Sequence, residues 1–565
     1  MTTLDIIIVI LSVSLAAVPS LLLARRAGKG KAEFFASGRS APWWLIGTSM
    51  VATTFSTDTP NLVTDLVRTG GVAANWAWWA FLVTGMVTVF FYAPLWRRAG
   101  FLTDLEFYEL RYAGKPAAFL RGFRAVYLGV FFNILVMASV TLAAVKMGSV
   151  MLGLSREDAV IACIAMSILF GAPAGLAGVL VSDAIQFSLA MVGVTGAAYF
   201  ALARPEVGGL QNLIATTDPQ TLSLLPSFSN TDALMSLLIV PFLIQWWSTW
   251  YPGAEPGGGS YIAQRMLAAR SPKDALQGTL WFNIAHYALR PWPWILVALA
   301  SMKVFPTLDS LQAALPHVDP ALIGHDLAYP AMLLGLPSGF KGLVVAALLA
   351  AYLSTMSTHM NWGASYIVND VYVRFMNPHA AEKRLVLLGR VSSALIAIAA
   401  GAFMLTLGSA SEAFNMLISV GAGTGAIYLM RWFWWRVNPW TEIVGMAVSL
   451  VVALFFRYST ATAAFSGSLK LVITVALTTF AAVIATYAFA PSDDATLRRF
   501  IEKTGVGGGL WRAARTRLGI TSPEKTHFGD SLQGAIAGCA LVYSLLFGVG
   551  ELLYGRPGPA LGFGV

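Results

Sequence analysis

The chain consists largely of apolar runs, each long enough to cross a lipid bilayer. A hydrocarbon core of roughly 30 Å requires about 20 consecutive apolar residues in a helix. Of the 565 residues, 57% are hydrophobic and 12% are charged, and a soluble domain carries about 25% charged residues. We therefore predict an all-α fold, a polytopic membrane protein with about 14 transmembrane helices. The runs lie at residues 5–24, 43–67, 73–96, 125–153, 157–177, 180–203, 231–252, 276–302, 339–373, 385–408, 412–432, 438–457, 468–490 and 530–554.

The basic residues predict how the chain is oriented in the membrane. Cytoplasmic loops carry an excess of Lys and Arg, and most of the 37 basic residues follow the odd-numbered runs. Both termini are therefore expected on the outer side of the membrane. That membrane is expected to be a plasma membrane, specifically a bacterial inner membrane. The net charge of +9 is then an orientation signal and not a nucleic-acid footprint. The cytoplasmic stretch 491–528 is expected either to lie as a basic helix on anionic lipid or to be a solvated loop.

Two runs are interrupted by polar residues and proline. The run 43–67 contains TTFSTDTP at residues 53–60, and proline removes a backbone donor and disfavours helix at the residue before it. Such a segment at membrane depth requires a protein-lined cavity. The run 231–252 shows a weaker version ahead of Pro252. Interrupted helices in corresponding halves indicate an inverted-repeat transporter with its site near the midplane, and a plain kink in each helix is the alternative.

A cluster of hydroxyl residues in the run 339–373 is the third anomaly. Ser354, Thr355, Ser357 and Thr358 fall within five positions. Hydroxyls in membrane helices often bond back to a carbonyl one turn earlier. Hydroxyl and carbonyl oxygens are also the ligands that a hard cation such as Na⁺ requires in place of its water shell. From the residues alone, both interpretations stay open.

Four stretches resemble the sodium/solute symporter family. They are EFFASGRSAPWWLIGTSMVATTFS, GLAGVLVSDAIQFSLAM, YIAQRMLAARSPKDA, and LVVAALLAAYLSTMST with the following NWGASYIVNDVYVRF. They are similar, in order, to the opening of the first core helix, the start of the fifth, the loop between the sixth and seventh, and the eighth. The resemblance implies the inverted-repeat fold of the bacterial leucine transporter. It implies a 5+5 core at 31–435, with a leading helix at 1–30 and accessory helices at 436–565.

The resemblance also implies ion sites, carried over residue by residue. One sodium would lie between the first and eighth core helices, bound by three backbone carbonyls and two hydroxyls. These ligands would be Ala52, Phe55, Ala351, Ser354 and Thr355. A possible second sodium would use Asp183, Ser357 and Thr358. Asp183 has an alternative interpretation, as the N-terminal cap of its helix.

The solute is expected to bind beside the interrupted first core helix. Candidate residues are Asp58, Thr59, Gln245, Trp246, His286 and Arg290. A carboxylate at mid-membrane is costly, so Asp58 is a functional candidate for binding an amine or hydroxyls, completing an ion site or carrying a proton. Arg290 lies one turn after His286 and could hold a substrate carboxylate. Its alternative is a structural pairing with Asp58, Asp65 or a carbonyl near Pro291.

We therefore predict sodium-coupled symport of a small organic solute into the cell by alternating access. One or two sodium ions would be the coupling ions, and no organic cofactor, enzymatic activity or nucleic-acid partner is expected. A sugar or an organic acid fits the site, but the residues do not name the solute. Proton coupling on the same scaffold, through Asp58 or Asp183, is one alternative, and a non-transporting solute sensor is another.

Overall fold

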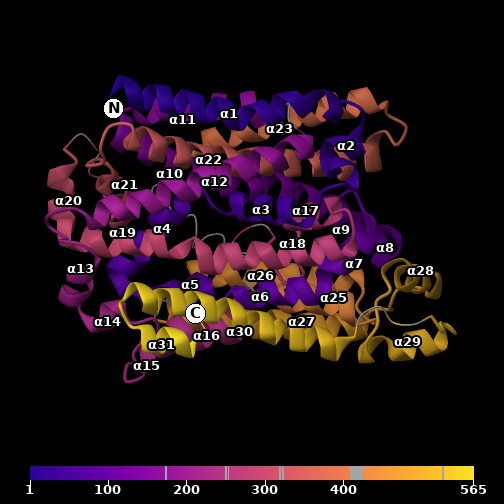
Figure 1. The fold of residues 1–565 in the computed structure, drawn as a ribbon. Helices are drawn as coiled ribbons and strands as arrows, with labels where there is room; N and C mark the ends of the chain where they lie inside the picture. Colours follow the sequence, from indigo (N-terminus) through magenta and orange to yellow (C-terminus); the bar gives the residue numbers. More distant parts are fainter. Residues whose placement is uncertain are drawn as a thin grey trace.

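The chain forms a bundle of long helices that lie side by side (Figure 1). The computed structural model describes residues 1–171, 175–247, 251, 253–316, 318, 320, 323–407, 424–462, 464–522, 524 and 527–564, and within these ranges it contains no β-strand. The predicted all-α class is therefore confirmed. The longest helices are α1 (Thr3–Ala27), α10 (Asn133–Leu152), α11 (Arg156–Gly171), α12 (Gly175–Leu202), α22 (Phe340–Ser365), α23 (Glu382–Met404), α26 (Pro439–Tyr458), α27 (Gly467–Ala488) and α30 (Phe528–Leu553).

Several membrane crossings are made of consecutive shorter helices. The first of these comprises α5 (Trp76–Trp79), α6 (Leu82–Val87), a π-helical turn at Thr88–Tyr92 and α7 (Ala93–Ala99). A second joins α9 (Gly114–Val126) to α10 through a π-helical turn at Tyr127–Phe132. A third runs through α18 (Pro272–Ile284), a π-helical turn at Ala285–Leu289 and α19 (Pro291–Val304).

Eight helical stretches in the described part of the chain are long and apolar enough to cross a membrane, or nine if the bent pair of α18–α19 and α20 (Leu308–Ala314) is included. A multi-pass membrane protein is thereby confirmed, whereas the count of 14 stays a prediction. Five predicted runs are not among these stretches. Four of them form described helices: 5–24 forms α1, 157–177 forms α11, 43–67 forms a broken helix, and 231–252 begins with a short apolar helix. Most of the fifth, at 412–432, lies outside the described residues.

The interruption predicted within the run 43–67 is confirmed. Helix α3 (Trp43–Thr53) ends at the break, residues 54–57 are not helical, and α4 (Asp58–Gly70) begins after it. Pro60 falls in the first turn of α4, where backbone N–H groups have no intrahelical partner, so its missing donor costs nothing there. The break therefore allows a proline within a segment that still crosses the bundle.

The second interruption, within the run 231–252, is also present. Helix α16 (Val240–Leu243) and a single 3₁₀ turn at Gln245–Trp247 precede it, and α17 (Ser260–Ala268) follows it. The described residues 253–259 between them are not helical. Gly253, Gly257 and Gly258 adopt positive φ angles of 93°, 93° and 63°, a backbone conformation that glycine adopts without steric cost. The segment YIAQRMLAA, expected within a loop, is therefore largely a buried helix.

The broken helix α3/α4 lies inside the bundle. Helix α3 packs against α12 and α18, and α4 packs against α19. Gly47 of α3 and Gly278 of α18 permit the close approach of these two helices, because a Cβ atom at either position would overlap the opposite helix. Helix α22 packs against both α12 and α1. The break is consequently surrounded by helices and not by lipid, as a non-helical segment at membrane depth requires.

Several of the short helices lie at the two ends of the bundle (Figure 1). One end carries α2 (Lys31–Ala36), α8 (Glu106–Arg111), α28 (Asp494–Thr504) and α29 (Arg512–Arg517). The other carries α13 (Leu210–Thr216), α14 (Pro219–Leu222), α20 and α21 (Ala328–Leu333). Segments that the basic residues predict to be cytoplasmic therefore share one end. Their orientation relative to a membrane stays a prediction.

The stretch 491–528 packs against the bundle, which neither expectation for it anticipated. Phe500 of α28 and Trp511 are both buried, and their rings stack with centroids 5.6 Å apart. The Trp511 indole N–H donates to the carbonyl of Trp432 at 2.8 Å. The guanidinium of Arg111 lies over both rings, 5.4 Å from Phe500 and 5.1 Å from Trp511. This stretch is therefore docked by a buried aromatic pair and by cation–π contacts.

Replacing Trp511 should release this docked stretch. Because truncation of a buried aromatic side chain costs about 3–5 kcal/mol, Trp511→Ala should lower the thermal unfolding midpoint in detergent and speed proteolysis within residues 505–528. Leu510→Ala is the matched control, since Leu510 is 59% exposed. Equal stability and equal protease resistance of the two variants would contradict the docking.

Candidate ion and substrate site

Thr355 and Ala351, two of the residues expected to bind the first sodium, lie against the end of α3. The Thr355 hydroxyl of α22 lies 2.8 Å from the Thr53 carbonyl and 3.2 Å from the Ala351 carbonyl. The Ala52 carbonyl accepts a 3.1 Å hydrogen bond from the Phe55 N–H, within the turn that leads into the break. All of these residues are buried. The structure therefore brings hydroxyl and carbonyl oxygens of α22 against the carbonyl end of α3.

Ser354 points to a different partner. Its hydroxyl donates to the Asp183 carboxylate of α12 at 2.6 Å. The Ser49 hydroxyl donates to the other carboxylate oxygen. The Arg265 guanidinium lies 3.6 Å from that same oxygen, and both charged side chains are at most 1% exposed. Asp183 lies eight residues inside α12, so its alternative interpretation as an N-terminal cap is wrong.

Arg265 links the residues expected for the second sodium. It donates to the Thr358 hydroxyl at 2.6 Å and to the Ser49 hydroxyl at 3.1 Å. Ser357 is not part of this group, because its side chain is only partly buried and lies beside Gly171 of α11. Asp183 and Thr358 are therefore brought together through a guanidinium group. The sequence offered one signal for Arg265, a basic residue within the apolar stretch YIAQRMLAA.

His286 and Arg290 meet the break from the opposite side. The Arg290 N–H bonds to the Ala285 carbonyl at 3.3 Å, five residues back, within the π-helical turn. Turns of this kind are rare and often occur at functional sites. Both side chains are fully buried. The Thr54 hydroxyl, in the unwound segment, lies 3.0 Å from His286 Nδ1 and 3.3 Å from Arg290 Nη1. His286 and Arg290 thus lie on one face, as expected, and that face contacts the unwound segment through Thr54.

Of the three structural partners considered for Arg290, namely Asp58, Asp65 and a carbonyl near Pro291, the structure shows a contact with the carbonyl. Its Nε donates to the His286 carbonyl at 3.2 Å, one turn before Pro291, and Nη2 lies 2.8 Å from the His286 ring. No Asp or Glu oxygen of the described residues lies within 4.0 Å of its guanidinium. Asp58, at the start of α4, is therefore not its ion-pair partner. The neighbouring Thr59 hydroxyl lies 3.5 Å from the Asp58 carboxylate.

The remaining two substrate candidates lie elsewhere. Gln245 and Trp246 belong to the 3₁₀ turn before the second interruption. The Gln245 side chain is outside the described part of the structure. Trp246 is half-buried, and its ring centroid lies 5.8 Å from that of Trp247. The described contacts of Trp246 therefore do not join it to His286 or Arg290.

Aromatic side chains surround His286 and Arg290, and the composition gave no hint of which ones. The Trp78 ring lies 5.8 Å from the His286 ring and the Tyr251 ring 6.5 Å. Arg290 lies 5.3 Å over the Trp294 ring, which in turn packs edge-on against Phe55 of the break. Trp78 belongs to α5, Trp294 to α19 and Phe55 to the break, so segments far apart in the sequence build this aromatic surround.

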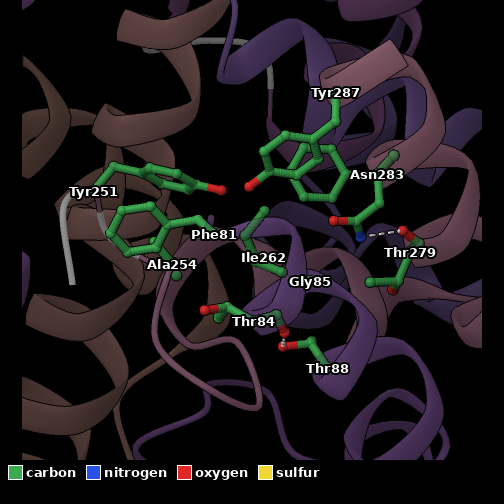
Figure 2. A pocket seen from close by; sticks show the side chains of 12 residues that line it. Phe81, Thr84, Gly85, Thr88, Tyr251, Ala254, Ile262, Thr279, Asn283 and Tyr287 are labelled. Carbon is green, nitrogen blue, oxygen red and sulfur yellow. Dashed lines mark hydrogen bonds between the residues drawn. The ribbon is translucent and has the colours of Figure 1, made fainter. Parts of the chain in front are cut away.

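A pocket opens beside these rings, toward the end of the bundle that carries α2 and α8. Its cavity volume is about 10 Å³, which is room for about one water molecule, so a solute would require the pocket to widen. Figure 2 shows the hydroxyl groups of Tyr251 and Tyr287 pointing toward one another across it. Thr84 and Asn283 also line it, and the Thr84 hydroxyl and the Asn283 amide oxygen are buried without a hydrogen-bond partner among the described residues. The pocket thus combines aromatic faces with unused polar atoms.

The opposite end of α4 is closed by a polar network. The Arg68 guanidinium donates to the Phe305 carbonyl at 2.7 Å and to His325 at 3.2 Å. Lys146 of α10 forms a 2.9 Å ion pair with Asp326, beside His325. These contacts join α4, α10, α19 and the segment before α21. The site is thus covered at the end that carries α20 and α21.

Separating the Asp183–Arg265 pair should destabilise the fold. Breaking a buried ion pair leaves one uncompensated charge and costs about 3–5 kcal/mol, so Arg265→Gln should lower the thermal unfolding midpoint strongly. The neutral double variant Asp183→Asn/Arg265→Gln should recover most of that loss. Arg498→Gln is the control, since Arg498 is 47% exposed in its pair with Glu502. A double variant no more stable than Arg265→Gln would count against the pairing.

The chain is similar to known sodium-coupled transporters. A model of the sodium:solute symporter family matches residues 34–449. A sodium/glucose cotransporter of Vibrio parahaemolyticus is 26% identical over 446 residues, which are 76% of this chain and 80% of the relative. Sodium/glucose cotransporter 1 of Oryctolagus cuniculus is 24% identical over 469 residues, 74% of this chain and 66% of the relative. A sodium/mannose cotransporter of Bos taurus is 24% identical over 487 residues, 79% of this chain and 78% of the relative.

The fold is also shared with a solved transporter. A Na⁺-coupled sialic acid symporter, in a substrate-bound outward-open state, aligns with a TM-score of 0.70 and 20% identity. The alignment covers 87% of this chain and 99% of that one. Since the family model spans well over half of the sequence, this chain belongs to the sodium:solute symporter family.

Proposed function

We propose that this protein imports a small polar organic solute together with sodium, by alternating access at the break between α3 and α4. Membership of the sodium:solute symporter family makes it a sodium-coupled transporter and not an enzyme. The observation that carries the proposal for this chain is the position of Thr355, 2.8 Å from the Thr53 carbonyl and 3.2 Å from the Ala351 carbonyl. A hydroxyl and carbonyls at a helix break supply the oxygen ligands that a hard cation requires.

In this proposal the coupling sodium binds between α3 and α22. Its ligands are the carbonyls of Ala52, Phe55 and Ala351 and the hydroxyl of Thr355, with Ser354 adjoining. Sodium would insert where Thr355 now bonds directly to the end of α3. Because an ion bound there attracts oxygens from both helices, its binding strengthens the contact between α3 and α22, and its loss returns Thr355 to the Thr53 carbonyl.

We further propose that one sodium moves per cycle. Arg265 places a positive charge 3.6 Å from Asp183 and 2.6 Å from Thr358, where a second sodium was expected. A second ion at this position would require the guanidinium to leave, because two cations would repel each other in a medium of low dielectric constant. The group at Asp183 then has a structural task, joining α3, α12, α17 and α22.

Access to the site is proposed to alternate between the two ends of the bundle. The Arg68 and Lys146 network covers the end that carries α20 and α21. The pocket of Tyr251 and Tyr287 lies toward the other end (Figure 2). With the basic loops in the cytoplasm, the structure then corresponds to a state closed to the outside, with both termini outside. We also propose the core at 31–435, arranged as 5+5 inverted repeats, within about 14 helices of a bacterial inner membrane.

The names of the relatives and the candidate contact residues of this chain both narrow the choice of solutes to test. Relatives are named for glucose and mannose, so sugars are the first class to test. Asp58, Thr59, His286 and Arg290 are proposed to contact the solute. Because sodium drives members of this family, coupling to protons through Asp58 and a role as a sensor are less favoured.

Sodium binding to the purified protein tests this proposal. We expect saturable ²²Na⁺ binding with a Hill coefficient near one. Removal of one direct ligand in Thr355→Ala should weaken it by at least tenfold, about 1.4 kcal/mol, and Ser354→Ala should weaken it less. Thr406→Ala is the control, since this threonine is exposed at the end of α23.

Two results would contradict the proposal. One is wild-type protein without saturable sodium binding, combined with sodium-independent uptake that rises at low pH, which would identify a proton-coupled carrier. The other is a Hill coefficient near two that falls to one in Asp183→Asn, which would place a second sodium at Asp183.

A further inference from the structure

Arg290 is a buried cation without an anionic partner. It is fully buried, and its guanidinium has no described carboxylate oxygen within 4.0 Å. Two other buried arginines have a carboxylate partner, since Arg121 lies 2.7 Å from Asp370 and Arg265 lies 3.6 Å from Asp183. Arg111 and Arg124 are buried against carbonyls, tyrosine hydroxyls and aromatic rings, so what sets Arg290 apart is its position at the helix break. The described hydrogen bonds of Arg290 go to Thr54 and to the carbonyl and ring of His286, all of them uncharged acceptors. A guanidinium has five N–H donors. Nη2 lies against both ring nitrogens of His286, at 2.8 and 2.9 Å, so the second N–H of Nη1 remains for another group.

We infer that Arg290 binds the carboxylate of the solute, and that the solute is a monocarboxylate carrying several hydroxyl groups, the class of sugar acids. This inference rests on the proposed function, since it assigns the substrate class of the same site. A guanidinium binds a carboxylate through two parallel hydrogen bonds. A neutral sugar would leave the Arg290 charge without a partner.

The balance of charge around the break supports an anionic solute. Asp183 lies against Arg265, whereas Asp58 acts on Arg290 electrostatically from beyond 4.0 Å. The buried Glu255 beside the pocket accepts a 3.0 Å hydrogen bond from the Gly253 N–H. Because a charge without a direct partner is costly at low dielectric constant, a solute carboxylate in contact with Arg290 would be stabilised. The anion and the sodium would then stabilise each other's binding, which is the energetic basis of coupled transport.

The position of Arg290 links this anion to the ion-binding break. Arg290 Nη1 lies 3.3 Å from the hydroxyl of Thr54, a residue of the unwound segment. Its guanidinium also lies over Trp294, which packs against Phe55 with ring centroids 4.9 Å apart. A carboxylate on Arg290 would thus lie next to the residues whose carbonyls are proposed to bind sodium.

The polar lining of the neighbouring pocket suits a solute that carries several hydroxyl groups. The Thr84 hydroxyl and the Asn283 amide oxygen are buried without a described partner, and such atoms are costly unless a ligand or water satisfies them. In Figure 2 the Asn283 oxygen and the hydroxyls of Tyr251 and Tyr287 face the interior of the pocket. Solute hydroxyl groups could both donate to and accept from these atoms, while the aromatic rings would cover the carbon skeleton.

Thermal unfolding with two acids and a neutral sugar tests this assignment. Sodium D-gluconate and sodium D-glucuronate are compared with D-glucose in NaCl, and choline salts replace the sodium salts in parallel. We expect at least one acid to raise the unfolding midpoint in sodium, with an apparent Kd at least tenfold lower than that for glucose. Arg290→Gln should abolish this preference, and Arg290→Lys should retain it with weaker binding. Arg270→Gln, 63% exposed at the start of the same helical segment, should behave like wild type.

The outcomes separate this inference from the proposed function. Absence of ²²Na⁺ binding to the wild type would contradict the proposed function. Retained sodium binding with no response to either acid would overturn the sugar-acid assignment alone. So would equal responses to glucose and the acids, or an acid preference that is unchanged in Arg290→Gln. If Arg290→Gln does not fold, the wild-type preference and the Arg290→Lys variant still decide the question.

Discussion

Backbone groups left unbonded at membrane depth must find partners in the protein, and the break between α3 and α4 creates such groups at residues 54–57. Surrounding helices contact the break and the end of α3 from two sides. On one side Thr355 of α22 reaches the Thr53 carbonyl at 2.8 Å. On the other side His286 and Arg290 meet the Thr54 hydroxyl. A single local unwinding therefore organises both the ion side and the solute side of the site. Non-helical backbone at membrane depth must be surrounded by protein, and the surrounding side chains form the two sides.

The two buried arginines around this break differ in what they leave unsatisfied. Arg265 is balanced by Asp183 and joins four helices, so its charge is used within the fold. Arg290 has only neutral partners within hydrogen-bonding distance. A charge without a counterion is unfavourable in a medium of low dielectric constant, and a transporter can use that cost to favour the arrival of an oppositely charged solute. The electrostatic cost of a buried charge thus favours the Asp183 ion pair at Arg265, and we propose that it favours an anionic solute at Arg290.

Sequence patterns predicted the elements whose signal is local. Pro60 among hydroxyl residues marked the break, and four-residue spacing placed His286 and Arg290 on one face. The patterns failed where several helices must be known together. Ser357 and Thr358 are neighbours in sequence, yet a turn of about 100° per residue directs Ser357 toward α11 and Thr358 toward Arg265. The family resemblance implied a loop for the stretch that contains Arg265, whereas a helix, α17, follows the glycine-rich break there.

The most direct measurement is a high-resolution cryo-EM map of the purified protein, recorded once in sodium chloride and once in choline chloride. The account predicts a density peak in sodium only, bounded by the carbonyls of Ala52, Phe55 and Ala351 and the hydroxyl of Thr355, with Thr355 released from the Thr53 carbonyl. Identical maps in the two salts, or a sodium-dependent peak at Asp183 with Arg265 displaced, would contradict it.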